Sequence, residues 1–251
     1  MTRARDAADQ INRVNSSAAN ATAITISALE NVGIGTSSPD NVGSTTALTI
    51  NRASGNGQLS LMGNGTVYGR IFADNATGDL KMGNPTSNDV MFYTANLERM
   101  RIDATGAVTM PTQPAFLAQV ATVQSNLANY VTVAIFGTEV FDQNADFNNS
   151  TGVFTAPVTG KYMLSTMLRL DQIPPTGTGV LQAQFATSNR TVFAMFDPIV
   201  FDATSTAQSF SQSLLMDMDA GDTAKVQVYM PVASSTVDIA TTSWFSGYLV
   251  A

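Results

Sequence analysis

The stretch "TGVFTAPVTGKYMLS", residues 151–165, decides the fold of the C-terminal part of the chain. It begins with a glycine turn, passes through a proline and enters a strand that continues to residue 170. One face of this strand carries the mainly apolar residues Tyr162, Leu164, Thr166, Leu168 and Leu170, and the other face carries Met163, Ser165, Met167 and Arg169. Such a period of two predicts a strand that is buried on one side.

The same alternation recurs at intervals of about a dozen residues through the C-terminal part. It is found in residues 181–185, 210–218, 224–230 and 244–249, and the turn "DAGD", residues 219–222, separates two of these segments. Several short alternating strands joined by turns are typical of an antiparallel sandwich. We therefore predict an all-β jelly-roll head over residues 114–251.

Three separated blocks in this head resemble the globular head of complement C1q and its tumour-necrosis-factor-like relatives. The residues that carry the resemblance are Phe116, Gly152, Phe154, Pro157, Gly160, Tyr162, Gly221, Asp222, Phe245, Gly247 and Tyr248. The resemblance implies a C1q-like jelly roll that assembles as a compact homotrimer. It also implies that the turn in residues 151–160 leads into a core strand near the threefold axis.

Residues 31–113 have a different character, with short strands of four to six residues between Gly, Asn and Asp turns. Such strands carry too little apolar surface to fold alone, and Leu59 and Leu61 share one face of one of them. We predict a thin trimeric β stalk, in which copies of the chain supply the missing core to one another. Arg99 and Arg101 share a strand face, where we expect acidic groups of a neighbouring copy or solvent.

Residues 1–30 are rich in alanine, and their apolar residues from Ala4 to Ala21 recur at spacings of three and four. This spacing predicts a short helix, or an anchor peptide that becomes ordered on a partner. The residues expected to dock on another virion protein are Arg3, Arg5, Asp6, Asp9 and Ile11.

Three segments outside the head resemble fibre proteins of bacteriophages. The segments "NVGIGT" and "ERMRIDATG" resemble stalk sequences of bacteriophage tail fibres, and "TRARD" resembles the openings of marine-phage fibre proteins.

Composition excludes several classes of function. The formal net charge is −7 and the pI is about 4.4, so the basic surface that nucleic-acid binding requires is missing. The sequence shows no long apolar run and no secretory leader, so we predict no membrane insertion, synthesis in a bacterial cytoplasm and location in the virion. The chain has no Cys and no His, which removes the common catalytic nucleophile and base arrangements, and we predict that it is not an enzyme.

The turn after residue 216 contains three nearby carboxylates, those of Asp217, Asp219 and Asp222. We interpret it as an ordinary solvated turn, with two alternatives: a glycosidase site or a calcium site. Close carboxylates are the machinery of a glycosidase, and together with carbonyl oxygens they also suit calcium. Relatives implied by the C1q resemblance hold calcium near the trimer axis with acidic residues of the head. We expect no cofactor, with calcium as the one exception, and the spacing assigns no metal ligands.

Loops on a rigid jelly roll are the expected contact points for a host-surface receptor, either a glycan or a protein. The candidate loop residues are Gln172, Thr176, Thr178, Asn189, Arg190, Ser234, Ser235 and Thr236. The combined prediction is a trimeric structural fibre of a bacteriophage, anchored by its N-terminus and presenting the head to a host cell. The alternatives are a capsid decoration or collar fibre with a purely structural role, and a bacterial C1q-like adhesin or lectin.

Overall fold

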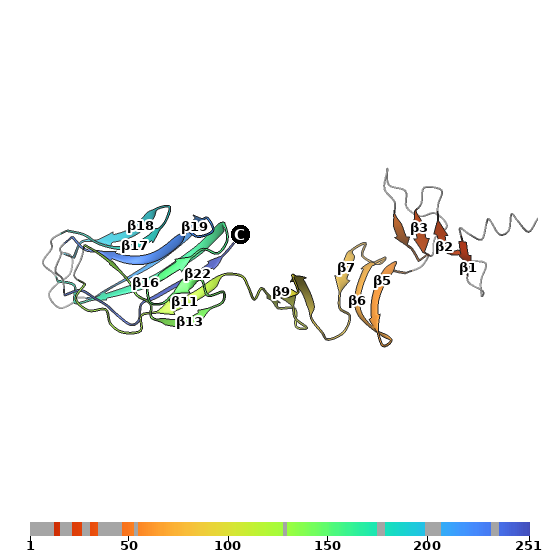
Figure 1. Ribbon diagram of the computed structural model, residues 1–251, viewed down its shortest axis with the longest axis horizontal. Helices are drawn as coiled ribbons and strands as arrows, with labels where there is room; N and C mark the ends of the chain where they lie inside the picture. Colours follow the sequence, from red (N-terminus) through yellow and green to blue (C-terminus); the bar gives the residue numbers. More distant parts are fainter. Residues whose placement is uncertain are drawn as a thin grey trace, which may run out of the picture. The chain divides into compact units, whose positions relative to one another are not determined.

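The computed structural model describes residues 13–15, 22–26, 31–34, 47–52, 55–127, 130–174, 179–198, 207–231 and 236–251. The chain divides into two compact units, residues 1–109 and 110–251. The described residues form strands, turns and loops with no α-helix among them (Figure 1), which confirms the predicted all-β class. None of the described segments forms an apolar helix of the length that a bilayer crossing requires.

The head, residues 110–251, consists of two antiparallel sheets. The first has the strand order β13–β11–β22–β16–β19, with β21 also paired to β16, and the second has the order β14–β15–β20–β17–β18, with β12 also paired to β20. The strands of the first sheet are β11 (Ala115–Gln119), β13 (Thr138–Asp142), β16 (Gly160–Asp171), β19 (Gln208–Met218), β21 (Asp238–Ile239) and β22 (Trp244–Leu249). Those of the second are β12 (Val131–Val133), β14 (Phe147–Asn148), β15 (Val153–Thr155), β17 (Leu181–Thr187), β18 (Thr191–Phe196) and β20 (Thr223–Tyr229). This is the predicted jelly-roll arrangement.

Strand β16 follows the alternation predicted from its sequence. Its inward residues Tyr162, Leu164, Thr166, Leu168 and Leu170 are all buried. Thr166 is the one polar member of this row, and its hydroxyl donates a hydrogen bond of 2.7 Å to the backbone oxygen of Trp244. The buried hydroxyl therefore has an acceptor and does not carry the cost of an unpaired polar group.

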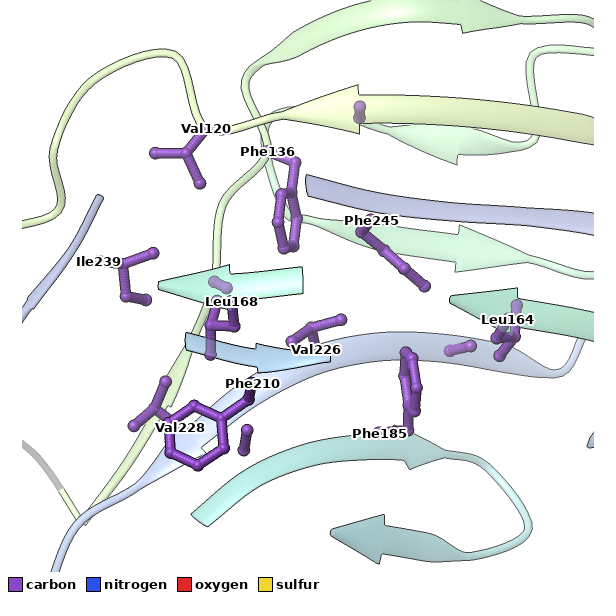
Figure 2. Close-up of a cluster of buried hydrophobic side chains, with 14 of the residues drawn as sticks. Val120, Phe136, Leu164, Leu168, Phe185, Phe210, Val226, Val228, Ile239 and Phe245 are labelled. Carbon is purple, nitrogen blue, oxygen red and sulfur yellow. The ribbon is translucent and has the colours of Figure 1, made fainter. Parts of the chain in front are cut away.

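The core between the two sheets is built around Phe116 of β11. Its ring stacks on Phe147 at 4.8 Å and on Phe154 at 4.9 Å, and it meets the ring of Phe245 edge-on at 4.9 Å. Because Phe116 and Phe245 belong to the first sheet and the other two rings to the second, these contacts join the two layers. Further along the core, Phe136, Leu168, Phe185 and other apolar side chains fill the space between the sheets (Figure 2).

The unit formed by residues 1–109 begins with a four-stranded sheet of order β1–β2–β3–β4. Its strands are β1 (Arg13–Asn15), β2 (Thr22–Ile26), β3 (Val32–Ile34) and β4 (Leu48–Ile50). The helix predicted through residue 21 is therefore wrong at residues 13–15, where the chain is a strand paired with β2. The β-branched Thr and Ile residues of β2 favour a sheet, and pairing with β2 outweighs a weak helical spacing made mostly of alanine.

Two three-stranded antiparallel sheets follow in the sequence. The first consists of β5 (Gln58–Gly63), β6 (Thr66–Ala73) and β7 (Leu80–Gly83), and the second of β8 (Val90–Thr94), β9 (Leu97–Ile102) and β10 (Val108–Thr109). For the arginines of β9 we expected acidic groups of a neighbouring copy or solvent, but Arg101 pairs with Asp89 and Glu98 of the same chain. The Arg101 guanidinium accordingly lowers the pKa of Glu98. Arg99 donates to the hydroxyl of Thr94 at 2.7 Å.

Candidate functional site

One end of the head is organised around the buried carboxylate of Asp238 in β21. Its Oδ1 accepts a hydrogen bond of 2.8 Å from the backbone nitrogen of Asn126, and its Oδ2 accepts one from the side-chain amide of Gln172. The hydroxyl of Thr236 donates to the backbone oxygen of Gln172 at 2.9 Å. The structure thus brings together Gln172 and Thr236, two of the predicted receptor-facing residues.

A second set of hydrogen bonds holds the neighbouring segment in place at this end. The backbone of Gln124 exchanges hydrogen bonds of 3.1 and 3.0 Å with Ile239, and its side-chain amide bonds both the oxygen and the nitrogen of Ile135. Three segments that are distant in sequence are therefore fixed to one another beneath the surface. We call this end of the head, defined by Asn126, Gln172, Thr236 and Asp238, the loop platform. The candidates Thr176, Thr178, Ser234 and Ser235 lie outside the described residues.

The other two candidates, Asn189 and Arg190, lie in the turn between β17 and β18. Arg190 forms an ion pair of 2.6 Å with Asp217, and the amide of Asn189 donates to Oδ2 of Asp222 at 2.9 Å. This turn lies where β16 begins, whereas the loop platform lies where β16 ends. Because β16 has 12 residues, the two ends are separated by about 35 Å of strand. The predicted loop residues that the structure describes therefore divide into two pairs at opposite ends of the head, Gln172 with Thr236 and Asn189 with Arg190.

The hydrogen bonds of the Asp217–Asp222 turn hold the turn itself together. Asp222 accepts from the backbone nitrogen of Asp219 at 2.8 Å in addition to Asn189, so its carboxylate closes the turn. A shallow hollow of about 320 Å³ lies beside it, lined by Thr159, Gly160, Lys161, Asn189, Asp217, Met218, Asp219 and Ala251. In the part of the chain that the structure describes, no group of three or more acidic side chains is arranged to hold a metal ion.

The outer face of the first sheet carries several large apolar side chains, on either side of a row formed by Ser165, Ser213 and Ser246. We call it the open face, and it comprises Leu117, Phe141, Met163, Met167, Leu215, Trp244 and Tyr248. Phe141, Leu215 and Tyr248 are each about half exposed, at 49%, 52% and 51%. The strand register places Met163 beside both Leu215 and Tyr248, and Met167 beside Trp244. A hollow of about 600 Å³ lies on the β11–β22 part of this face.

The outer face of the second sheet contrasts with the open face in its central strands. The outward positions of β17 and β20 carry Gln182, Lys225 and Gln227, with Tyr229 as the one aromatic residue among them. The exposed apolar residues of this sheet are Phe193 and Met195 on β18 and Val131 on β12. Apolar outward residues that continue across several strands mark an interaction surface. The open face therefore has the character of an interaction surface.

The comparison with known families matches residues 115–250 to the C1q domain. The chain belongs to the C1q family. Among solved structures, the globular domain of zebrafish complement 1qA matches with 21% identity and a TM-score of 0.40, covering 55% of this chain and 98% of that one. Murine APRIL at pH 5.0 matches with 11% identity and a TM-score of 0.41, covering 55% and 99%. No curated protein matches the chain.

The residues that carried the C1q resemblance hold structural positions in the C1q head. Phe116, Phe154, Tyr162 and Phe245 are buried in the core, and Gly247 is buried between them. Gly152 has φ of +69° and lies so close to Ala134 that a Cβ there would be 2.3 Å from its oxygen. Gly221 is in the turn closed by Asp222, Pro157 precedes β16, Gly160 begins it, and Tyr248 is on the open face. C1q domains are binding domains, so the head is a recognition module.

Sequence reasoning did not single out Leu117, Phe141 and Leu215 as functional residues. The signal was present, because each is an apolar residue at an outward position of an otherwise amphipathic strand. The predicted docking residues Arg3, Arg5, Asp6, Asp9 and Ile11 lie outside the described residues.

Proposed function

We propose that the protein is a trimeric fibre of a bacteriophage virion, anchored by its N-terminus and presenting its C1q head for recognition of a host surface. The observation that carries the proposal is the apolar open face of the head, which a single chain leaves uncovered. The resemblance of "NVGIGT", "ERMRIDATG" and "TRARD" to fibre sequences supports the virion setting. These segments lie outside the C1q match, which begins at residue 115.

The open face accounts for trimerisation of the head. Aromatic residues and Met are enriched in the centres of protein interfaces, and the open face carries Trp244, Tyr248, Phe141 and two Met residues. Each large side chain that becomes fully buried contributes roughly 1.5 to 3 kcal/mol. The C1q resemblance implies three copies. With one chain of 26.4 kDa, the particle has three times that mass.

The loop platform is the end of the head that we assign to the receptor. The buried Asp238 holds Asn126 and Gln172 in place, and residues that are already fixed lose less conformational entropy when they bind. The Asn189–Arg190 turn is at the end where the chain enters the head, since Leu249 donates a backbone hydrogen bond to Pro114 there. We therefore assign no receptor contact to Asn189 and Arg190.

Two measurements test this function. Sedimentation of the purified protein is expected to give a trimer, and a folded monomer would contradict the proposal. For recognition, residues 174–179 and 232–236 are replaced by Gly-Ser segments of equal length, and binding of the variant to host cells is compared with wild type. Binding is expected to be lost, while a matched variant with Asn189→Ala and Arg190→Ala at the opposite end keeps it.

The same experiments distinguish the receptor-binding fibre from a fibre with a purely structural role. A trimer whose platform variants bind host cells as wild type does would favour a decoration or collar fibre. Deletion of residues 2–14 is expected to abolish incorporation into the virion, and unchanged incorporation would refute the anchoring role.

A further inference from the structure

One face of the β5–β6–β7 sheet carries a group of exposed apolar side chains. The pairing of Leu59 with Ile71 and of Ile71 with Met82 places these three side chains in one row across the sheet. The same register adds Leu61 and Leu80 to this side. The exposed fractions are 47% for Leu59, 64% for Leu61, 44% for Ile71, 73% for Leu80 and 62% for Met82.

The opposite face of this sheet carries the polar and charged side chains, several of which have partners within the same chain. Gln58, Ser60, Arg70, Phe72 and Lys81 belong to it, and so does the exposed Met62 at its end. The Arg70 guanidinium lies 4.6 Å from the centre of the Phe72 ring, and Lys81 pairs with Asp74. Phe72 is the only one of the sheet's large apolar side chains described here that is buried, and it lies on this polar face. The apolar face is therefore the side that lacks a covering layer.

The β8–β9–β10 sheet repeats the same division. Val90, Ile102 and Val108 form a row across its three strands, and the pair Phe92–Met100 continues the apolar side. The other side carries Met91, Arg101 and Thr109, and Arg101 is paired with Asp89 and Glu98. Phe92 is 42% exposed and Val108 is 55% exposed.

We infer that these two apolar faces are self-association surfaces, each of which packs against the same face of two further copies of this chain around a threefold axis. The inference rests on the proposed trimeric fibre and names the residues that form the interior of its stalk. Leu59, Leu61, Ile71, Leu80 and Met82 form the interior of one segment, and Val90, Phe92, Met100, Ile102 and Val108 form that of the next.

Three observations point to further copies of the chain as the occupant. First, a lone three-stranded sheet needs a covered apolar face to be stable, so the partner must be present whenever the segment is folded. Second, the apolar residues named above form uncharged surfaces, and the one charged group beside them is Arg99, whose Nε donates to Thr94 at the hairpin end of the second sheet. An uncharged surface requires an uncharged partner surface, which a second copy of the chain supplies. Third, each face exposes an apolar patch of the kind that marks interaction sites, and the open face of the head in the same chain has the same character.

The absence of cysteine from the chain makes a direct test available. Leu61→Cys and Met82→Cys each place a single thiol on the apolar face, and Ser60→Cys places one on the polar face one residue away. The full-length variants are treated with a three-armed maleimide under native conditions. Leu61→Cys and Met82→Cys are expected to give covalent dimers and trimers, and Ser60→Cys is expected to give only singly labelled chains.

The outcomes distinguish this inference from the proposed function. A protein that sediments as a trimer but whose Leu61→Cys variant does not cross-link would overturn the assignment of this face and leave the fibre proposal standing. A protein that sediments as a monomer would overturn both. Phe92→Cys, with Met91→Cys as its control, applies the same criterion to the second sheet, and equal cross-linking of the two variants would refute the assignment there.

A charge substitution provides an independent measurement. Leu61→Glu is expected to make residues 58–109 sensitive to protease while the trimeric head stays resistant, because it introduces three carboxylates at the axis. Ser60→Glu is its matched control on the polar face and is expected to leave the digestion pattern unchanged. Equal resistance of both variants would contradict the inference.

Discussion

Gly247 of β22 lies directly opposite Phe116 of β11, and the Phe116 ring occupies the space that a side chain on Gly247 would need. A Cβ placed at Gly247 would be 2.7 Å from Cε1 of Phe116 and 2.8 Å from Cδ2 of Leu164. The glycine therefore allows the central aromatic ring of the core to reach both sheets. Glycine is required at position 247 because of the space that a side chain would occupy, and not because of the backbone conformation there.

Gly247→Ala is expected to destabilise the head by about 1 to 3 kcal/mol, because the added methyl group overpacks the core. Chemical denaturation followed by Trp244 fluorescence measures the change. Ser246→Ala, the adjacent residue on the outer face, is the control and should change the free energy of unfolding by less than about 0.5 kcal/mol. Equal stability of the two variants would show that Phe116 can move without cost.

Asp238→Ala is expected to destabilise the loop platform by about 1 to 3 kcal/mol, since the backbone nitrogen of Asn126 loses its acceptor in a buried site. Asp238→Asn keeps an oxygen for Asn126, and Gln172 can turn its amide to accept from the new donor. The asparagine variant should therefore recover most of the lost stability in thermal unfolding. If both variants melt alike, the charge of Asp238 matters more than its hydrogen bonds.

The contribution of Asp146 to the stability of the head changes with pH in the opposite direction to that of most carboxylates. Burial is the main cause that raises its pKa in the folded protein, and the nearby charge of Asp142 adds to it. A carboxyl with a raised folded pKa favours folding below its unfolded pKa, and this contribution is lost as pH rises through the folded value. Asp146→Asn should therefore stabilise the head relative to wild type above about pH 6 and much less near pH 3. Melting temperatures of the two proteins across this range give the comparison, and a constant difference would disprove the pKa assignment.

Trp244→Glu is expected to convert a trimeric head to smaller species, because it places three carboxylates in the proposed apolar interface. Thr191→Glu introduces the same charge at an exposed position of the second sheet and should leave the mass unchanged. Light scattering coupled to size exclusion measures both. A trimeric Trp244→Glu protein would move the interface away from the open face.

The sequence alone was sufficient for the sandwich because its longer strands, such as β16 and β19, are amphipathic. In β16, five alternating buried residues show the inward side without any knowledge of the neighbouring strands. The prediction of an N-terminal helix, in contrast, was wrong at residues 13–15. There the helical spacing depended mainly on alanines, which contribute little burial, and the pairing of residues 13–15 with β2 prevailed.

The candidate sites were less predictable because they depend on contacts between distant segments. Asp238 joins Asn126 and Gln172, and no local spacing connects these three positions. The separation of Gln172 from Asn189 follows from strand direction and length, which place their loops at opposite ends. Simple alternation along β9 would place Glu98 and Arg101 on different faces, but the register shift opposite Phe92 and Tyr93 brings them to the same face, where they form an ion pair.

The hydrogen bond from Leu249 to Pro114 brings the first and last strands of the head together at one end. Neighbouring entry and exit points are the property that makes a domain transferable. The head can thus be grafted as a cassette into a loop of an unrelated carrier with a short linker at each junction. Its loop platform would then point away from the carrier, ready to display foreign peptides.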